Sequence, residues 1–198
     1  MSPSPRSPVR VAVLISGAGS NMAALIDAAR APGAPFEIAL VLSNKPDAGG
    51  LAVAEAKGVA TVAMDHRPFD KDREAHERAV HAELERHGVE VVALAGYMRL
   101  LTPWLVGRWA GRMLNIHPSL LPKYPGLDTH ARALEAGDAE AGCTVHLVTE
   151  GVDEGPILAQ ASVPIVAGDT PPGLAQRVLE AEHRLYPHAL SAFCRTLD

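Results

Sequence analysis

The stretch VRVAVLISGAGSNMAALIDAAR, residues 9–30, decides the fold. Residues 9–16 are a nearly continuous apolar run of strand length, and residues 22–30 are rich in alanine and typical of a helix. Only the glycine-rich turn GAGSN separates the two segments. Strands this apolar are covered on both faces, as in parallel sheets. The stretch therefore predicts the first strand–turn–helix unit of an α/β protein.

The same alternation continues along the chain. Apolar runs predict strands, and amphipathic or alanine-rich segments predict helices, several of them ending at a glycine. The predicted strands lie at 9–16, 36–44, 60–65, 89–96 and 112–117, and the helices at 22–30, 48–58, 70–88 and 102–111. Strand–helix alternation of this kind favours an open sheet with right-handed crossovers.

The last third of the chain changes character. Two further strands are predicted at 142–150 and 157–166, with a closing helix at 169–193. Only six residues join these strands, whereas a parallel pair needs a crossover of a dozen residues or more. We therefore expect an open, mostly parallel, Rossmann-like α/β sheet with helices on both faces and an antiparallel edge formed by the last strands.

Composition limits the classes of function. Of the 198 residues 47% are hydrophobic and 21% charged, and the formal net charge is −5, which argues against a nucleic-acid or membrane surface as the main partner. Two cysteines form neither a disulfide framework nor a cysteine zinc site. The Ser/Pro-rich residues 1–8 are predicted to be a disordered tail and 9–198 a single domain. Since neither a signal peptide nor a spanning segment is found, we expect a cytoplasmic protein.

The turn after the first strand is a candidate anion site. Backbone N–H groups and the helix dipole favour a phosphate there, and the side chains of Ser20 and Asn21 add donors next to Gly19. A dinucleotide fingerprint is not matched, because Met22 stands at the third glycine position and no acid follows the second strand. The turn is thus either a cradle for a phosphate monoester or an ordinary strand–helix connection.

The segment LNIHPSLLPKYPG, residues 114–126, is the candidate catalytic centre. Residues i and i+2 of a strand share a face, so Asn115 and His117 point the same way, and Pro118 ends the strand behind them. Two donors that converge on one point resemble an oxyanion hole beside a general acid. The alternative is structural, with both side chains satisfying the backbone of a proline loop.

A protonated histidine at neutral pH needs a carboxylate nearby, because its reference pKa is about 6.5. Asp153 is the best candidate, in the turn between the last two strands, and Glu150 and Glu154 compete with it. Among the other histidines, three lie on a charged helix and are expected to be solvated, namely His76, His81 and His87. The rest form no metal-ligand spacing: His66, His130, His146, His183 and His188.

Five segments together resemble the phosphoribosylglycinamide formyltransferase family, which are folate-dependent enzymes of purine synthesis. They are VLISGAGSN, SNKPDAGGL, LAGYMRLLTP, LNIHPSLLPKYPGL and VHLVTEGVDEGPILAQASVPI, and the match extends from about Val11 to the closing helix. The resemblance implies transfer of formyl from 10-formyltetrahydrofolate to the amine of 5′-phosphoribosylglycinamide through a tetrahedral intermediate, with no metal.

The resemblance also assigns roles to single residues. Asn115 and His117 would stabilise the oxyanion, His117 would donate the proton, and Asp153 would keep His117 protonated. Gly19, Ser20 and Asn21 would bind the phosphate, and Glu182 the glycinamide end. The folate-binding residues would be Arg73, Met98, Arg99, Leu100, Leu101 and Asn115.

Two of these assignments have a plainer structural alternative. Without the resemblance, Glu182 is a solvated helix carboxylate and the segment 98–101 is ordinary core. The chain also departs from the family pattern, with Asp128 where a histidine is familiar and one extra residue in FDKDRE, just before Arg73.

The rival functions are another formyl-folate enzyme, namely a hydrolase or a formyltransferase acting on Met-tRNA or a nucleotide sugar, and a non-catalytic module. A formyltetrahydrofolate hydrolase would carry an extra domain in front, for which there is no room before Val11. A non-catalytic nucleotide-binding module would use the glycine turn, but has no use for Asn115, His117 and Asp153 together. The oligomeric state stays open at this point.

Overall fold

The computed structural model describes residues 7–197, so that residues 1–6 of the predicted tail lie outside the described residues. Within 7–197 a seven-stranded sheet has the order β3-β2-β1-β4-β5-β6-β7. The parallel strands are β1 (Val9–Ile15), β2 (Phe36–Ser43), β3 (Thr61–Ala63), β4 (Val91–Leu94) and β5 (Met113–His117). The antiparallel edge is β6 (Glu140–Leu147) and β7 (Ile157–Pro164). The predicted mostly parallel sheet with an antiparallel edge is confirmed.

Helices cover both faces of the sheet because side chains of β1 alternate between them. Val11, Val13 and Ile15 pack towards α1 (Ser20–Ala29), α2 (Gly49–Ala56) and α6 (Pro171–Cys194). Ala12 and Leu14 pack on the other side, towards α3 (Arg73–Arg86) and α4 (Pro103–Arg108). β1 is fully buried from Val11 onwards, which explains its continuous apolar sequence.

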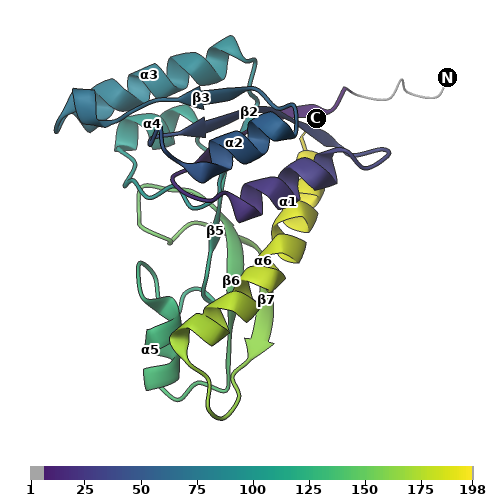
Figure 1. Ribbon diagram of the computed structural model, residues 1–198, viewed down its shortest axis with the longest axis vertical. Helices are drawn as coiled ribbons and strands as arrows, with labels where there is room; N and C mark the ends of the chain where they lie inside the picture. Colours follow the sequence, from purple (N-terminus) through teal and green to yellow (C-terminus); the bar gives the residue numbers. More distant parts are fainter. Residues whose placement is uncertain (1–6, 198) are drawn as a thin grey trace.

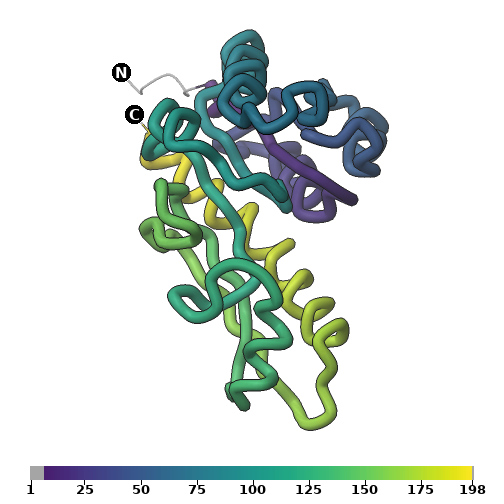
Figure 2. The backbone as a smooth tube through the Cα atoms, turned by 90° about the vertical axis from the view of Figure 1, so that its left-hand side faces the viewer, coloured from purple at the N-terminus to yellow at the C-terminus, as the bar shows by residue number. Residues whose placement is uncertain are grey.

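The chain narrows towards its antiparallel end. β6, β7 and α5 (Thr129–Glu135) form an extension below the parallel strands, and α6 runs along it from end to end (Figures 1 and 2). The hydroxyl of Tyr186 on α6 donates to the carbonyl of Leu94 at 3.0 Å, which fixes the helix against the end of β4. In residues 7–197 no helix is long and apolar enough to cross a membrane.

The strand order on the two sides of β1 predicts where ligands bind. β1 leads to its neighbour β2 on one side, while β4 lies on its other side, so the strand order reverses between β1 and β4. Ligands of open α/β sheets bind beyond the carboxyl ends of the strands at such a reversal. The turn after β1 and the segment after β4 therefore lie at the expected crevice.

Some helix predictions need correction. The helix predicted at 70–88 begins only at Arg73, because the Asp72 side chain caps it by accepting from the N–H of Ala75 at 2.9 Å. A 3₁₀ turn, η1 (Arg67–Phe69), precedes it. Helix α5 was not predicted, since its seven residues are too few for a clear period. Asp128, the departure from the family pattern, precedes α5 with φ 58° and makes no capping hydrogen bond with its side chain.

The expected solvation of the α3 histidines was also wrong. His76 is fully buried, with Nε2 2.9 Å from the carbonyl oxygen of Met64, and burial lowers its pKa. His81 and His87 are partly buried. A charged helix still buries one stripe, and His76 lies on it beside Val80.

Candidate functional site

Asn115 and His117 lie on the same face at the end of β5. Leu114 and Ile116, on the opposite face, belong to the hydrophobic core. β5 runs between β4 and β6, so the two polar side chains stand in the middle of a sheet rather than at a free edge. Pro118 ends the strand, and the proline loop behind it contains a cis peptide bond between Leu121 and Pro122, as the sequence allowed.

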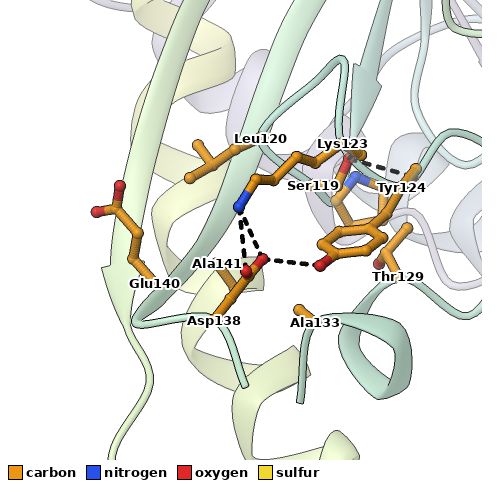
Figure 3. Close-up of a pocket in the computed structure, with 10 residues that line it drawn as sticks. Ser119, Leu120, Lys123, Tyr124, Thr129, Ala133, Asp138, Glu140 and Ala141 are labelled. Carbon is orange, nitrogen blue, oxygen red and sulfur yellow. Dashed lines mark hydrogen bonds and ion pairs between the residues drawn. The ribbon is translucent and has the colours of Figure 1, made fainter. Parts of the chain in front are cut away.

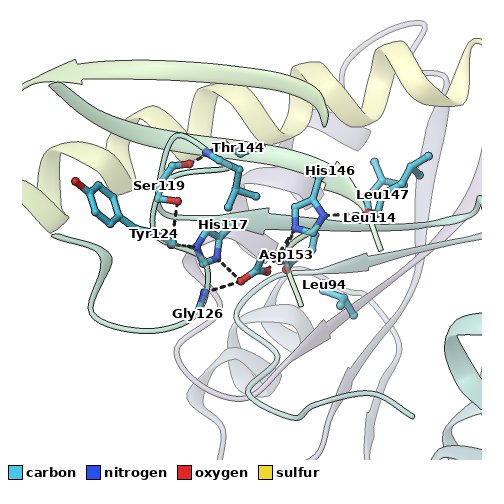
Figure 4. Close-up of polar contacts among 12 residues, drawn as sticks. Leu94, Leu114, His117, Ser119, Tyr124, Gly126, Thr144, His146, Leu147 and Asp153 are labelled. Atoms are coloured by element: carbon cyan, nitrogen blue, oxygen red, sulfur yellow. Dashed lines mark hydrogen bonds and ion pairs between the residues drawn. The ribbon is translucent and has the colours of Figure 1, made fainter. Parts of the chain in front are cut away.

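Asp153 reaches His117 from the turn between β6 and β7 (Figure 4). Its Oδ2 lies 3.4 Å from Nδ1 of His117 and accepts a hydrogen bond from the backbone N–H of Gly126 at 2.8 Å. Glu150 and Glu154, the competing acids, are exposed. The expectation that Asp153 is the acid opposite His117 thus agrees with the geometry.

The carboxyl group of Asp153 stays ionised in spite of its burial. Burial alone would raise its pKa, but the ring of His146, the N–H of Gly126 and the charge of His117 together hold the pKa below its ordinary value. The carboxylate therefore faces two imidazole rings as an anion at neutral pH.

The proline loop fixes the other nitrogen of His117. Because a carbonyl oxygen only accepts, Nε2 of His117 donates to the carbonyl of Tyr124 at 2.9 Å. Tyr124 has a positive φ of 56°, and its hydroxyl donates to Asp138 at 2.8 Å. The ammonium of Lys123 also binds Asp138, at 3.0 Å, across the small pocket shown in Figure 3. These contacts pin the loop, and with it the orientation of the imidazole ring.

His146 also belongs to this site, although no motif or spacing pointed to it. It lies directly opposite Asn115 in the β5–β6 register and is buried. Its Nδ1 donates to the carbonyl of Leu147 at 2.9 Å, and its Nε2 lies 3.2 Å from Nδ2 of Asn115. Nε2 also lies 3.6 Å from Asp153. Polar and apolar residues alternate along β6, a pattern that does not predict a buried histidine, and only the register shows which partner His146 meets.

The glycine turn has the geometry of an anion site. Gly19 is the N-cap of α1 with φ 73°, and no side chain caps the helix, which leaves its first N–H groups free for a ligand. A Cβ on Gly19 would lie 2.7 Å from Cε of Met22 and 3.1 Å from Cα of Gly50. Glycine is therefore required both by the backbone angle and by the close approach of α2.

Glu182 lies beside this turn and is not a solvated helix carboxylate. It is buried on α6, and Oε2 accepts a hydrogen bond from Nδ2 of Asn21 at 2.6 Å. Burial raises its pKa, with the Asn21 bond opposing the shift. The Oδ1 atom of Asn21 is buried without a hydrogen-bond partner in the described structure. An amide and a carboxyl group are thus held together next to the anion site.

The segment after β4 is exposed rather than core. The side chains of Met98 and Leu100 are 66% and 64% exposed, which overturns the plain structural alternative for this segment. Arg73, at the start of α3, donates from its guanidinium to the carbonyl of Leu100 at 3.3 Å. The extra residue before Arg73 has therefore not moved this side chain away from the segment. Arg99 and Leu101 are half-buried.

Three groups of residues thus come together along one edge of the sheet: the side chains around His117, the glycine turn with Glu182, and segment 98–101. The formyl transferase family model matches residues 9–190. The chain belongs to the formyl transferase family. The phosphoribosylglycinamide formyltransferase of Escherichia coli strain K12 is 48% identical over 185 residues, which cover 93% of this chain and 87% of that protein. The family resemblance seen in the motifs is confirmed.

Other relatives agree with this formyl transferase assignment. A crystal structure of phosphoribosylglycinamide formyltransferase from Brucella melitensis shares 58% identity and a TM-score of 0.91, covering 95% of this chain and 96% of that one. The trifunctional purine biosynthetic protein adenosine-3 of Drosophila melanogaster is 50% identical over 184 residues. Those residues cover 92% of this chain but only 14% of the trifunctional protein.

Proposed function

We propose that this chain transfers the formyl group of 10-formyltetrahydrofolate to the amine of 5′-phosphoribosylglycinamide in de novo purine biosynthesis. The products are the N-formyl ribonucleotide and tetrahydrofolate. The observation that carries this function is the pair Asn115 and His117 at the end of β5, with the ionised Asp153 3.4 Å from the ring. A non-catalytic nucleotide-binding module would not need that arrangement.

The reaction needs stabilisation of one developing charge and movement of one proton. The substrate amine attacks the formyl carbon, and the carbonyl electrons move to oxygen to give a tetrahedral oxyanion. The amide N–H of Asn115 and the ring N–H of His117 donate to that oxygen. Collapse expels N10 of the folate, which takes a proton from His117, and the attacking nitrogen returns a proton to the imidazole, so that His117 ends the reaction as it began it.

Asp153 and His146 assist the two donors, His117 and Asn115. The carboxylate of Asp153 stabilises the positive charge of an imidazolium at His117. The ring of His146 lies 3.2 Å from Nδ2 of Asn115 and restricts the orientation of the amide that donates to the oxyanion. In the structure Nε2 of His117 donates to Tyr124, so we infer that this bond is exchanged for the reacting group when the substrates bind.

The two substrates occupy the neighbouring segments. Gly19, Ser20 and Asn21 hold the phosphate monoester at the N-terminus of α1, and Glu182 contacts the glycinamide end. Segment 98–101 binds the folate together with Arg73, whose guanidinium donates to the carbonyl of Leu100. The apolar side chains of Met98 and Leu100 are free to cover a flat pterin.

The wider setting of the enzyme follows from the same function. We propose a single formyltransferase domain over residues 9–198, a cytoplasmic location, and two small-molecule substrates as partners. Within residues 7–197 no group of three histidine, cysteine or acidic side chains is placed to hold a metal ion.

One assay separates the rival functions. Purified protein is incubated with 10-formyltetrahydrofolate, with and without 5′-phosphoribosylglycinamide, and both tetrahydrofolate and the N-formyl product are measured. Formyl transfer predicts that the two products appear in equal amounts and only when the amine is present. Turnover without the amine would indicate a hydrolase, and nucleotide binding without turnover would indicate a non-catalytic module.

A further inference from the structure

Ser16 connects the two segments that flank the strand reversal. It directly follows β1, precedes the glycine turn, and is buried. Its backbone N–H donates to the carbonyl of Gly96 at 3.1 Å. Its Oγ lies 2.8 Å from the backbone N of Met98 and 2.5 Å from Oδ1 of Asn44. A single serine thus contacts the ends of β1 and β2 and the segment that follows β4.

The direction of each hydrogen bond follows from the chemistry of the partners. The N–H of Met98 can only donate, so Oγ of Ser16 accepts from it. The one hydroxyl proton of Ser16 is then given to Oδ1 of Asn44. Asn44 is buried, and its backbone carbonyl accepts a hydrogen bond from Nδ1 of His66 at 2.9 Å, so the acceptor is itself held in place. Ser16 therefore has a defined donor and a defined acceptor.

Segment 98–101 depends partly on such bonds, because Leu101 alone among its apolar side chains packs against the core. The side chains of Met98 and Leu100 point into solvent. At the far end of the segment, the N–H of Thr102 donates to the buried carboxylate of Glu77 at 2.8 Å. At the near end, Ser16 holds the N–H of Met98. The backbone is held by these two buried side chains and, between them, by Arg73, which donates to the carbonyl of Leu100.

We propose that Ser16 is a positioning residue, which sets the distance between the folate-binding segment and the phosphate-binding turn. It touches neither substrate and acts through the backbone of Met98. This role rests on the proposed function, since it assigns segment 98–101 to the folate. Without the hydroxyl, the N–H of Met98 donates to water instead. The segment is then less ordered in the free protein, and the entropy cost of ordering it weakens folate binding.

The test compares Ser16→Ala with Ser43→Ala in the full chain. Ser43 is a matched control, because it is also a buried serine at the end of a parallel strand. Its hydroxyl bonds only within its own turn, to Lys45. Dissociation constants are measured by calorimetry for tetrahydrofolate and for 5′-phosphoribosylglycinamide. We expect Ser16→Ala to weaken tetrahydrofolate binding about tenfold and nucleotide binding less than about twofold, and Ser43→Ala to change neither by more than about twofold.

A second measurement does not involve substrate. Amide hydrogen exchange in the free protein should be faster at Met98 in Ser16→Ala than in wild type, with exchange in β1 and β4 unchanged. The positioning role would be overturned if Ser16→Ala weakened the binding of both ligands equally. It would also be overturned if wild type bound tetrahydrofolate and Ser16→Ala bound it with the same affinity. Failure of the wild type itself to bind tetrahydrofolate would instead overturn the proposed function.

Discussion

Replacing Asp153 by asparagine tests the proposed chemistry most directly. The substitution keeps the size of the side chain and an oxygen that can accept from the N–H of Gly126, but removes the negative charge beside His117. The nucleotide site at the other end of the crevice is untouched. We therefore expect a large loss of kcat with little change in the affinity for 5′-phosphoribosylglycinamide.

The separation of the two groups sets the size of the effect. Two unit charges 3.4 Å apart interact by about 5 kcal/mol at an effective dielectric constant of about 20. The side chains of His117 and Asp153 are 7% and 12% exposed, so solvent screens them little. The amide dipole of asparagine retains part of the interaction. A net loss of about 3 kcal/mol remains, which lowers kcat roughly a hundredfold.

The assay is single-turnover formation of the N-formyl product with both substrates saturating, accompanied by calorimetric binding of the ribonucleotide. Glu154→Gln is the matched control, since it removes an exposed carboxylate from the same turn and should retain wild-type kcat. Thermal unfolding checks that both variants are folded. A kcat within about threefold of wild type in a folded Asp153→Asn variant would remove Asp153 from the mechanism.

Three further predictions concern the nucleotide site and stability. Ser20→Ala should raise the KM for 5′-phosphoribosylglycinamide about tenfold, as expected for a lost hydrogen bond to a charged group; an effect confined to folate would mean that the two sites are exchanged. Glu182→Gln should raise the same KM. Because burial raises the pKa of Glu182, ionisation of this carboxyl above its unfolded pKa destabilises the wild type, so in urea unfolding the variant should gain stability relative to wild type as pH rises from 4 to 8. If the stability difference between Glu182→Gln and wild type did not change with pH, the raised pKa of Glu182 would be contradicted. Asp169, held at a pKa of about 2 chiefly by Arg177, contributes stability that is present above its unfolded pKa of about 3.8 and lost as pH falls towards 2. The urea midpoints of wild type and Asp169→Asn should therefore differ at pH 5 and converge near pH 2, whereas parallel midpoints would exclude this ion pair as the source.

Much of the fold could be predicted from local patterns. The continuous apolar strands predicted burial on both faces, and the six-residue connection predicted the antiparallel edge, because strand geometry forbids a parallel return that short. The same reasoning overextended α3 by three residues at its start and missed α5. Capping at Asp72 and the docking of a seven-residue helix depend on contacts that a periodic pattern does not contain.

For the candidate site, local sequence patterns were enough to predict which side chains share a face and where the backbone must turn. The two-residue spacing of Asn115 and His117, the proline behind them, and the glycine turn are consequences of local chain geometry. The partners of these side chains became evident from the folded chain. Asp153 rather than Glu150 or Glu154 reaches His117, and the buried His146 meets Asn115. These contacts depend on cross-strand register and on how a loop folds back, which bring together residues about thirty positions apart. Alternation along one strand carries no information about the register of its neighbour.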